Sequence, residues 1–190
     1  MKFKFFFILG SLAFAHSQLY AKIEKGTANS TVAPSEILDI TTIKTIEGKT
    51  IQVERNKEGL LFKGYEKKIV LLEFFGYGCP PCQASIPGLN RLQHTFPKDI
   101  VVITIESWDL KKNKLKDYVK NMDIQYKVVA KEDTGKIFTF VEGLNGWSPR
   151  YGVPFLMIFS FGGRLAENVL AHDINEDHIK NIIERIKKSD

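Results

Sequence analysis

Cysteine is scarce in this sequence, since only Cys79 and Cys82 occur among its 190 residues. So few cysteines exclude the disulfide-dense scaffold of many small secreted domains. Neither sign of charge is in large excess, because the sequence has 27 Lys and Arg residues and 22 Asp and Glu residues, which give a formal net charge of +5. The apolar run at 5–15 has 11 residues. A membrane-spanning helix needs about 20, so a polytopic membrane protein is also excluded.

The composition that remains is that of a soluble globular protein, with 44% hydrophobic and 26% charged residues. This balance excludes a disordered chain and a collagen-like repeat. A length of 190 residues suggests one domain, with a hydrophobic core large enough to be stable without additional cross-links. We therefore expect a single domain over 39–190, preceded by a small, polar and aperiodic leader at 22–38.

The N-terminal segment has the features of a targeting sequence. Lys2 and Lys4 precede the apolar run, and small-residue cleavage patterns end at Ala15 and Ala21. This arrangement predicts a secretory signal peptide over 1–21 and an exported, periplasmic protein, with an uncleaved N-terminal anchor as the open alternative. Cleavage of the signal peptide would remove two lysines and no acidic residue. The mild charge that is left argues against a nucleic-acid partner.

Hydrophobic periodicity predicts strands alternating with helices. The expected strands are a hairpin at 43–53 turning at Glu47-Gly48, buried runs at 69–75, 100–105 and 126–130, and a closing hairpin of 155–159 and 165–170. The expected helices run from Cys79 to Pro97, from a cap near Asp109, over 134–142 before Gly143, and from Asn175. Such an order predicts an α/β sheet with crossover connections and one antiparallel edge.

The two cysteines lie three positions apart, at the end of a predicted strand. A bridge between them closes a very short loop and stabilises little through loop entropy. One CxxC pair also makes a poor zinc site, because four ligands are usual and no second pair exists. In an oxidising compartment, a redox-active pair is therefore the interpretation that the spacing favours.

The helix pattern gives the two sulfurs different roles. Apolar positions recur on one face at spacings of four, three, three and four, namely Cys82, Ile86, Leu89, Leu92 and Phe96. Cys82 is thus expected to face the core, and Cys79 to be the exposed nucleophile at the helix start. Unpaired N–H groups and the helix dipole favour a thiolate there. Pro80 and Pro81 stiffen the turn but supply no N–H to the sulfur.

The segment 73–82 (EFFGYGCPPC) resembles the active site of the thioredoxin superfamily. Pro87 falls where that family has its helix-kinking proline, and 152–154 (GVP) resembles its cis-proline loop. Within the superfamily the chain resembles the TlpA/ResA/CcmG-type exported oxidoreductases, through the N-terminal hairpin, the 71 residues between Cys82 and Pro154, and Glu106 at the end of a strand. The resemblance implies a central mixed sheet flanked by helices, with an N-terminal β-hairpin and a central αβ insertion.

The resemblance also implies roles for individual residues. Glu73 would be a buried acid that exchanges a proton with Cys82, and burial would raise its pKa. Glu106 would tune the cysteine pair and substrate selectivity. Val153, before a cis Pro154, would pair with an extended substrate. A glutamate reaching solvent at Glu73 and a plain polar loop residue at Glu106 stay open as alternatives.

Aromatic residues near these motifs are candidates for a substrate groove. Tyr77 directly precedes the cysteine pair, and Trp108, Trp147 and Tyr151 line either the groove or the core. We expect no cofactor beyond the Cys79–Cys82 disulfide, and no metal.

The expected activity is reduction of protein disulfides by a monomer. A membrane electron donor resembling DsbD or CcdA would return the protein to its dithiol form. The family resemblance implies apocytochrome c among the substrates. Two departures leave the direction of electron flow open. Gly78 replaces the tryptophan that commonly precedes the first cysteine, and Phe155 replaces the threonine that often follows the cis-proline. The alternatives are a DsbA-like dithiol oxidase, which the segment 73–82 and Val153 also resemble, a copper(I) chaperone, since soft thiolates suit copper(I), and a docking domain with incidental cysteines.

Overall fold

The central strands form because their residues are apolar enough to be covered on both faces. β4 (Ile69–Phe75) and β5 (Ile100–Glu106) are buried at every position, as continuous runs in a covered sheet should be. The computed structural model describes residues 36–145, 147–148 and 152–189. The predicted signal peptide and residues 22–35 of the leader lie outside this range. Within it, no helix is long and apolar enough to cross a membrane.

Five strands make the central sheet in the order β6-β5-β4-β7-β8. β4 pairs in parallel with β5, and β5 in parallel with β6 (Lys127–Val129). β7 (Phe155–Phe159) and β8 (Leu165–Leu170) form the predicted hairpin, and β7 runs antiparallel to β4. This mixed sheet flanked by helices confirms the predicted fold class. The active-site strand β4 thereby lies at the centre of the sheet.

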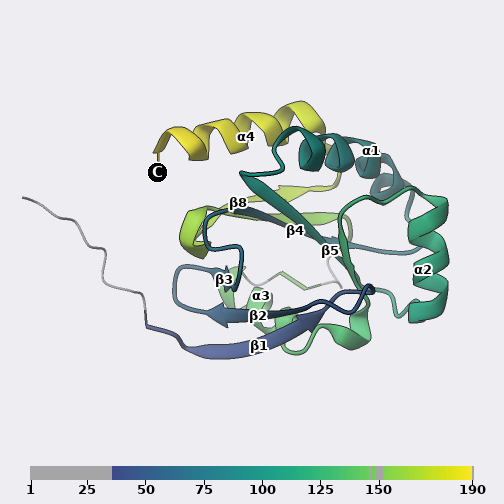
Figure 1. Cartoon of the computed structure of the whole chain (residues 1–190), viewed down its shortest axis with the longest axis horizontal. Coiled ribbons are helices and arrows are strands. Elements are labelled where there is room, and N and C mark those ends of the chain that lie inside the picture. Colours follow the sequence, from purple (N-terminus) through teal and green to yellow (C-terminus); the bar gives the residue numbers. More distant parts are fainter. Residues whose placement is uncertain (1–35, 146, 149–151, 190) are drawn as a thin grey trace, which may run out of the picture. The chain divides into compact units, whose positions relative to one another are not determined.

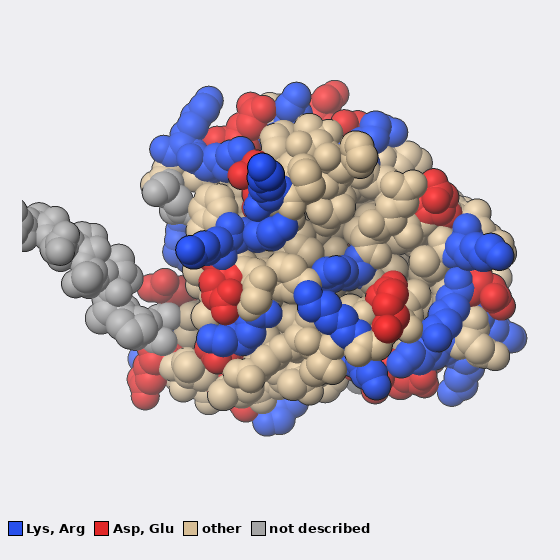
Figure 2. Space-filling model, in the orientation of Figure 1, with Lys and Arg blue, Asp and Glu red and all other residues tan. Residues whose placement is uncertain are grey.

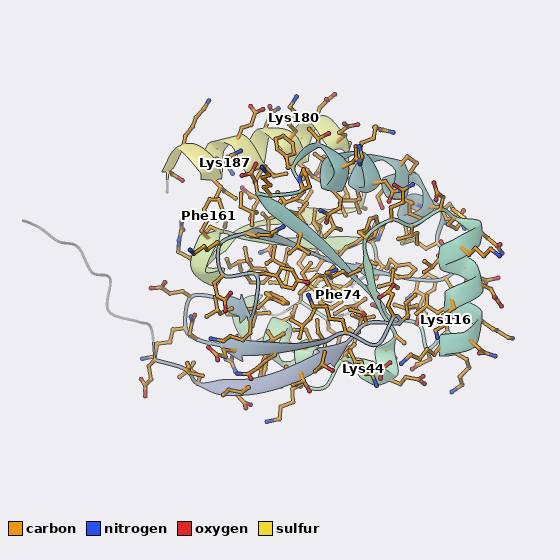
Figure 3. The ribbon with its side chains drawn as sticks, in the orientation of Figure 1. Lys44, Phe74, Lys116, Phe161, Lys180 and Lys187 are labelled. Carbon is orange, nitrogen blue, oxygen red and sulfur yellow. A yellow bond between two sulfur atoms is a disulfide. The ribbon has the colours of Figure 1, made fainter. Side chains whose placement is uncertain are left out.

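Each face of the sheet carries its own apolar core. α1 (Pro80–Thr95), α2 (Lys112–Asn121) and α4 (Glu176–Ser189) contribute to one cluster. α3 (Ile137–Asn145) and the N-terminal strands contribute to the other. Figure 1 shows α1 and α4 together on one side of the sheet and β1, β2 and α3 on the other. Phe74, labelled in Figure 3, is fully buried in the second cluster.

The N-terminal hairpin is present and forms part of a three-stranded sheet. β1 (Asp39–Lys44), β2 (Thr50–Arg55) and β3 (Leu60–Phe62) pair antiparallel in that order. Gly48 takes a φ of 95° in the turn, which is a conformation that glycine adopts without strain. The short strand β3 was not predicted, because three residues carry too little pattern to be recognised.

Two of the predicted helices have wrong boundaries. Asp109 does not cap α2, since it has a φ of 64° and its carboxylate bonds Lys131 instead. The helix predicted over 134–142 begins at Ile137 and continues through Gly143 to Asn145. The missing Cβ at Gly143 makes room for the Arg55 guanidinium, which would lie 2.9 Å from it. Asp109 and Gly143, the residues expected to mark helix ends, thus each lie close to a residue distant in sequence.

Short helical turns complete the connections. They are η1 (Lys131–Asp133) before α3, η3 (Phe161–Gly163) between β7 and β8, and η4 (Ala171–Asp173) before α4. Between β5 and β7 the chain therefore passes through α2, β6, η1 and α3, where the central αβ insertion is predicted. Figure 2 shows both basic and acidic side chains on the visible face, with the basic ones covering more of it. That distribution agrees with the small net charge.

Candidate active site

The two cysteines form a disulfide at the start of α1, just after the loop that follows β4. Cys79 is the N-cap of α1, and the Cys82 N–H donates to its Sγ over 3.3 Å. Pro80 and Pro81 supply no N–H, as expected, so the donor is the Cys82 N–H, the first backbone N–H of the helix. The prediction that Cys79 is exposed is wrong. Cys79 is 4% exposed and Cys82 is 1% exposed.

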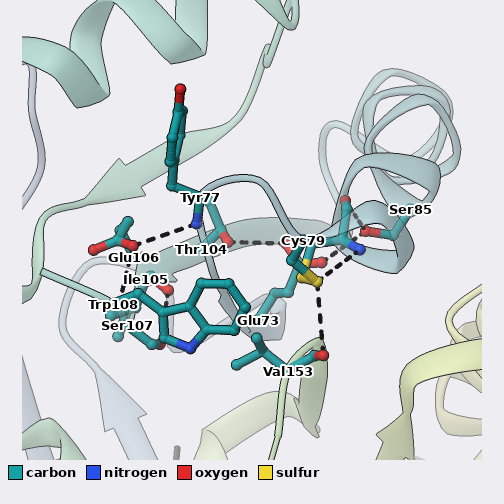
Figure 4. The surroundings of a disulfide bond; sticks show 11 residues. Glu73, Tyr77, Cys79, Ser85, Thr104, Ile105, Glu106, Ser107, Trp108 and Val153 are labelled. Atoms are coloured by element: carbon teal, nitrogen blue, oxygen red, sulfur yellow. Dashed lines mark hydrogen bonds between the residues drawn. A yellow bond between two sulfur atoms is a disulfide. The ribbon is translucent and has the colours of Figure 1, made fainter. Parts of the chain in front are cut away.

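The loop that precedes β7 covers the first sulfur. The Val153–Pro154 peptide bond is cis, as the resemblance implies. The Val153 carbonyl oxygen lies 3.7 Å from Cys79 Sγ, and Figure 4 shows this contact. The loop places a backbone carbonyl beside the sulfur, and backbone groups of this kind can pair with an extended polypeptide. The geometry thus brings together the three predicted residues Cys79, Val153 and Pro154.

Glu73 is buried at the middle of the central strand, with 1% of its side chain exposed. Ser85 Oγ donates to Glu73 Oε1 over 2.8 Å, and Thr104 Oγ1 donates to Oε2 over 2.8 Å. Removal from water raises the pKa of Glu73 to about 7, although the two hydrogen bonds act in the opposite direction. The alternative of a glutamate that reaches solvent is excluded. A carboxyl group with this pKa can take up or release a proton at neutral pH.

Glu106 is fully buried at the end of β5. Its Oε1 accepts the Trp108 N–H over 3.0 Å, and its Oε2 accepts the Leu110 N–H over 2.9 Å. The Tyr77 N–H lies 3.5 Å from Oε1. This carboxylate therefore holds the loop after β5 and also contacts the loop that leads to the cysteines. The alternative of a polar loop residue facing water does not fit its burial.

Two large aromatic side chains are exposed close to the cysteine loop. Tyr77 is 54% exposed and packs edge-on against Tyr118, with ring centroids 5.4 Å apart. Trp108 is 52% exposed. Its indole covers the backbone of Gly76 so closely that a Cβ there would lie 2.4 Å from the ring. Figure 4 shows both side chains in the surroundings of the disulfide.

The other aromatic candidates divide between core and undescribed chain. Trp147 is 7% exposed and stacks on Phe155 with centroids 4.3 Å apart, so it belongs to the core. Tyr151 lies outside the described residues. Over the described ranges, no group of three or more His, Cys, Asp or Glu side chains could hold a metal ion.

Sequence reasoning missed Ser85 and Thr104. Ser85 lies three positions after Cys82, one helical turn away, so the helix period places both on one face. Thr104 lies opposite Glu73 in the parallel register of β4 and β5. The first of these signals was available from the sequence. The second required the strand register.

Residues 66–165 match the thioredoxin-like family. The chain belongs to this family. The thiol-disulfide oxidoreductase ResA of Bacillus cereus is 24% identical over 134 residues, which cover 70% of this chain and 68% of that protein. Membership and this relative confirm the predicted enzyme class, a thiol–disulfide oxidoreductase with a Cys79–Cys82 pair.

Solved structures share the thioredoxin-like fold at low sequence identity. A thiol:disulfide interchange protein from Chlorobium tepidum aligns with a TM-score of 0.59 and 19% identity, over 81% of this chain and 97% of that one. A pneumococcal exposed lipoprotein thioredoxin from Streptococcus pneumoniae aligns with a TM-score of 0.58 and 20% identity, over 77% of this chain and 99% of that one. These likenesses confirm the fold.

Proposed function

We propose that this thioredoxin-like protein is an exported reductant of protein disulfides. The observation that carries the direction is the set of groups around Cys79 Sγ. In the described part of the chain it receives one backbone N–H, from Cys82, and it faces the Val153 carbonyl oxygen. A single donor and the negative end of a carbonyl dipole stabilise a thiolate only modestly. Strong dithiol oxidants depend on marked stabilisation of their reduced form, so this environment favours a reductant.

The reaction begins with the protein in its dithiol form. The Cys79 thiolate attacks one sulfur of a substrate disulfide, which forms a mixed disulfide and releases the other substrate sulfur as a thiolate that takes a proton from water. The Cys82 thiol then gives its proton to the Glu73 carboxylate. The Cys82 thiolate attacks Cys79 Sγ and releases the second substrate sulfur as a thiolate, which takes a proton from water. Two electrons have moved to the substrate, and the Cys79–Cys82 disulfide remains.

The surroundings of the pair suit a polypeptide substrate. The cis-proline loop offers the Val153 carbonyl for backbone pairing, and the exposed Tyr77 and Trp108 offer apolar contact. Glu106 keeps the backbone beneath these aromatics in place. A membrane electron donor resembling DsbD or CcdA would return the protein to its dithiol form. Unfolded apocytochrome c with its haem-attachment cysteines is one substrate of this kind.

Export rests on the N-terminal segment. The charged start, the short apolar run and the small-residue patterns over 1–21 fit a cleaved signal peptide. The similarity to an exposed lipoprotein thioredoxin supports the same location. In an oxidising compartment a reductant needs a supply of electrons, which is why a membrane partner is part of the proposal.

The reduction potential of the Cys79–Cys82 pair, measured by equilibration with defined thiol buffers, tests the direction. We expect a value toward about −270 mV, the thioredoxin end, and reduction of insulin that Cys79→Ser abolishes. A value near about −120 mV would instead establish a DsbA-like oxidase. Stoichiometric copper(I) on the purified protein without reductase activity would establish the chaperone alternative.

A further inference from the structure

The hydroxyl group of Ser85 has one proton and two acceptors within reach. Its Oγ lies 2.8 Å from Glu73 Oε1 and 2.9 Å from the Cys82 carbonyl oxygen. Ser85 is 5% exposed, so water has little access to its side chain. Figure 4 shows Ser85 on α1, the helix that begins at the cysteine pair. The side chain therefore connects the buried acid to the helical turn of the resolving cysteine.

A second hydroxyl holds the other carboxylate oxygen. Thr104 comes from β5, is 1% exposed, and donates to Glu73 Oε2 over 2.8 Å. An ionised carboxylate only accepts hydrogen bonds, so both hydroxyls donate to it. A protonated carboxyl group is a donor at one oxygen. Protonation of Glu73 at Oε1 would make Ser85 accept there and turn its own proton to the Cys82 carbonyl.

We propose that Ser85 is a positioning residue that sets the protonation equilibrium of Glu73 and transmits it to the turn of α1 carrying Cys82. The inference rests on the proposed role of Glu73 as the proton acceptor for Cys82. No heavy atom has to move, because rotation about one C–O bond exchanges the two hydrogen bonds. The proton that Glu73 gains comes from the Cys82 thiol.

Other titratable groups lie on the elements packed around Glu73. They are Cys79 and Cys82 at the start of α1, Glu106 further along β5, Tyr118 on α2 and Tyr126 before β6. The β7 residue opposite Glu73 is the apolar Leu156. No Lys, Arg or His is among the groups that shift the Glu73 pKa in the described part of the chain. The two hydroxyls are thus what favours the ionised form against desolvation.

The test compares Ser85→Ala with the hydroxyl-retaining control Ser85→Thr. A hydrogen bond to a charged group is strong enough that its loss should raise the Glu73 titration midpoint by about one pH unit. The midpoint is read by ¹³C NMR of the labelled glutamate carboxyl group in the dithiol protein, a measurement that requires no activity. Insulin reduction by Ser85→Ala should be about fivefold slower than wild type at pH 7 and recover at higher pH. Ser85→Thr should behave as wild type.

Thr104→Val gives an independent test if Ser85→Ala folds poorly, with Thr104→Ser as its control. Thr104→Val should also raise the titration midpoint of Glu73. In a Glu73→Gln background, Ser85→Ala should leave the pH profile unchanged. An unshifted NMR midpoint in both Ser85→Ala and Thr104→Val would overturn the inference, and so would an equal effect of Ser85→Ala in the Glu73→Gln background. Failure of the proposed function is a separate result, since the wild-type pair would then have the reduction potential of an oxidant, or the wild-type protein would not reduce insulin.

Discussion

The buried carboxylate of Glu106, at the end of β5, holds the backbone of the two loops that carry the exposed aromatic residues Tyr77 and Trp108. Glu106 accepts the N–H groups of Trp108 and Leu110 and contacts that of Tyr77. These backbone donors would lose their partner if the side chain were removed, and water has no direct access to a fully buried position. The resemblance pointed to Glu106 as a residue that acts on the cysteines. What the structure shows is that Glu106 holds the backbone of the neighbouring loops.

Replacing Glu106 should therefore destabilise the fold in a graded way. We expect Glu106→Ala to lower the free energy of unfolding by about 2–4 kcal/mol, because unpaired buried donors are costly. Glu106→Gln should cost less, since its amide oxygen still accepts. Urea unfolding of the oxidised protein measures both variants. Equal losses for Ala and Gln would show that the acceptor oxygens are not what matters.

At the scale of elements, the three-stranded sheet is attached to the central sheet by close backbone packing. η3 lies against β3, and a Cβ on Gly163 would be 2.4 Å from the Leu60 carbonyl oxygen. A Cβ on Gly59 would be 2.1 Å from the Gly163 carbonyl oxygen. Only two backbones without side chains can approach this closely, so glycine is required at both positions.

The neighbouring Gly162 provides a matched control for this junction. Gly162 and Gly163 have similar φ values, 75° and 86°, but no atom lies within 4 Å of the Cβ position at Gly162. Gly162→Ala should cost about 1 kcal/mol from backbone strain alone. Gly163→Ala should cost several kcal/mol, because β3 or η3 must move. Similar losses in urea unfolding would mean that the junction is loosely packed.

At the scale of the whole molecule, Glu73 links stability to pH. Its pKa is about 7 in the folded protein against an ordinary value of 4.5. The folded state therefore binds more protons than the unfolded state between these values. The free energy of unfolding is highest below about pH 4.5 with respect to this group and falls as the pH rises through 7.

Glu73→Gln should remove this dependence. In the wild-type protein, the raised pKa of Glu73 should lower the free energy of unfolding by about 3 kcal/mol between pH 4.5 and pH 8. The variant should accordingly be more stable than wild type at pH 8. Denaturant unfolding of the oxidised form across this range avoids any contribution from thiol titration. A parallel pH dependence in both proteins would contradict the assignment of the shift to Glu73.

The sequence by itself determined the elements whose pattern is local. The bounds of β4, β7 and β8 are those predicted, and α4 begins within one residue of the predicted start at Asn175. The position of the cysteine pair between a strand and a helix was also predictable, because the strand run, the two prolines and the helix period adjoin in the sequence. The resemblance supplied the cis bond before Pro154.

Only the tertiary structure decided how distant side chains meet. Thr104 reaches Glu73 because β4 and β5 pair in one register, and the Val153 carbonyl covers Cys79 because β7 lies beside β4. That covering buries a sulfur which the helix pattern alone placed in solvent. Strand register and loop packing depend on contacts far apart along the chain, whereas periodicity records only neighbours, so the first could not be derived from the second.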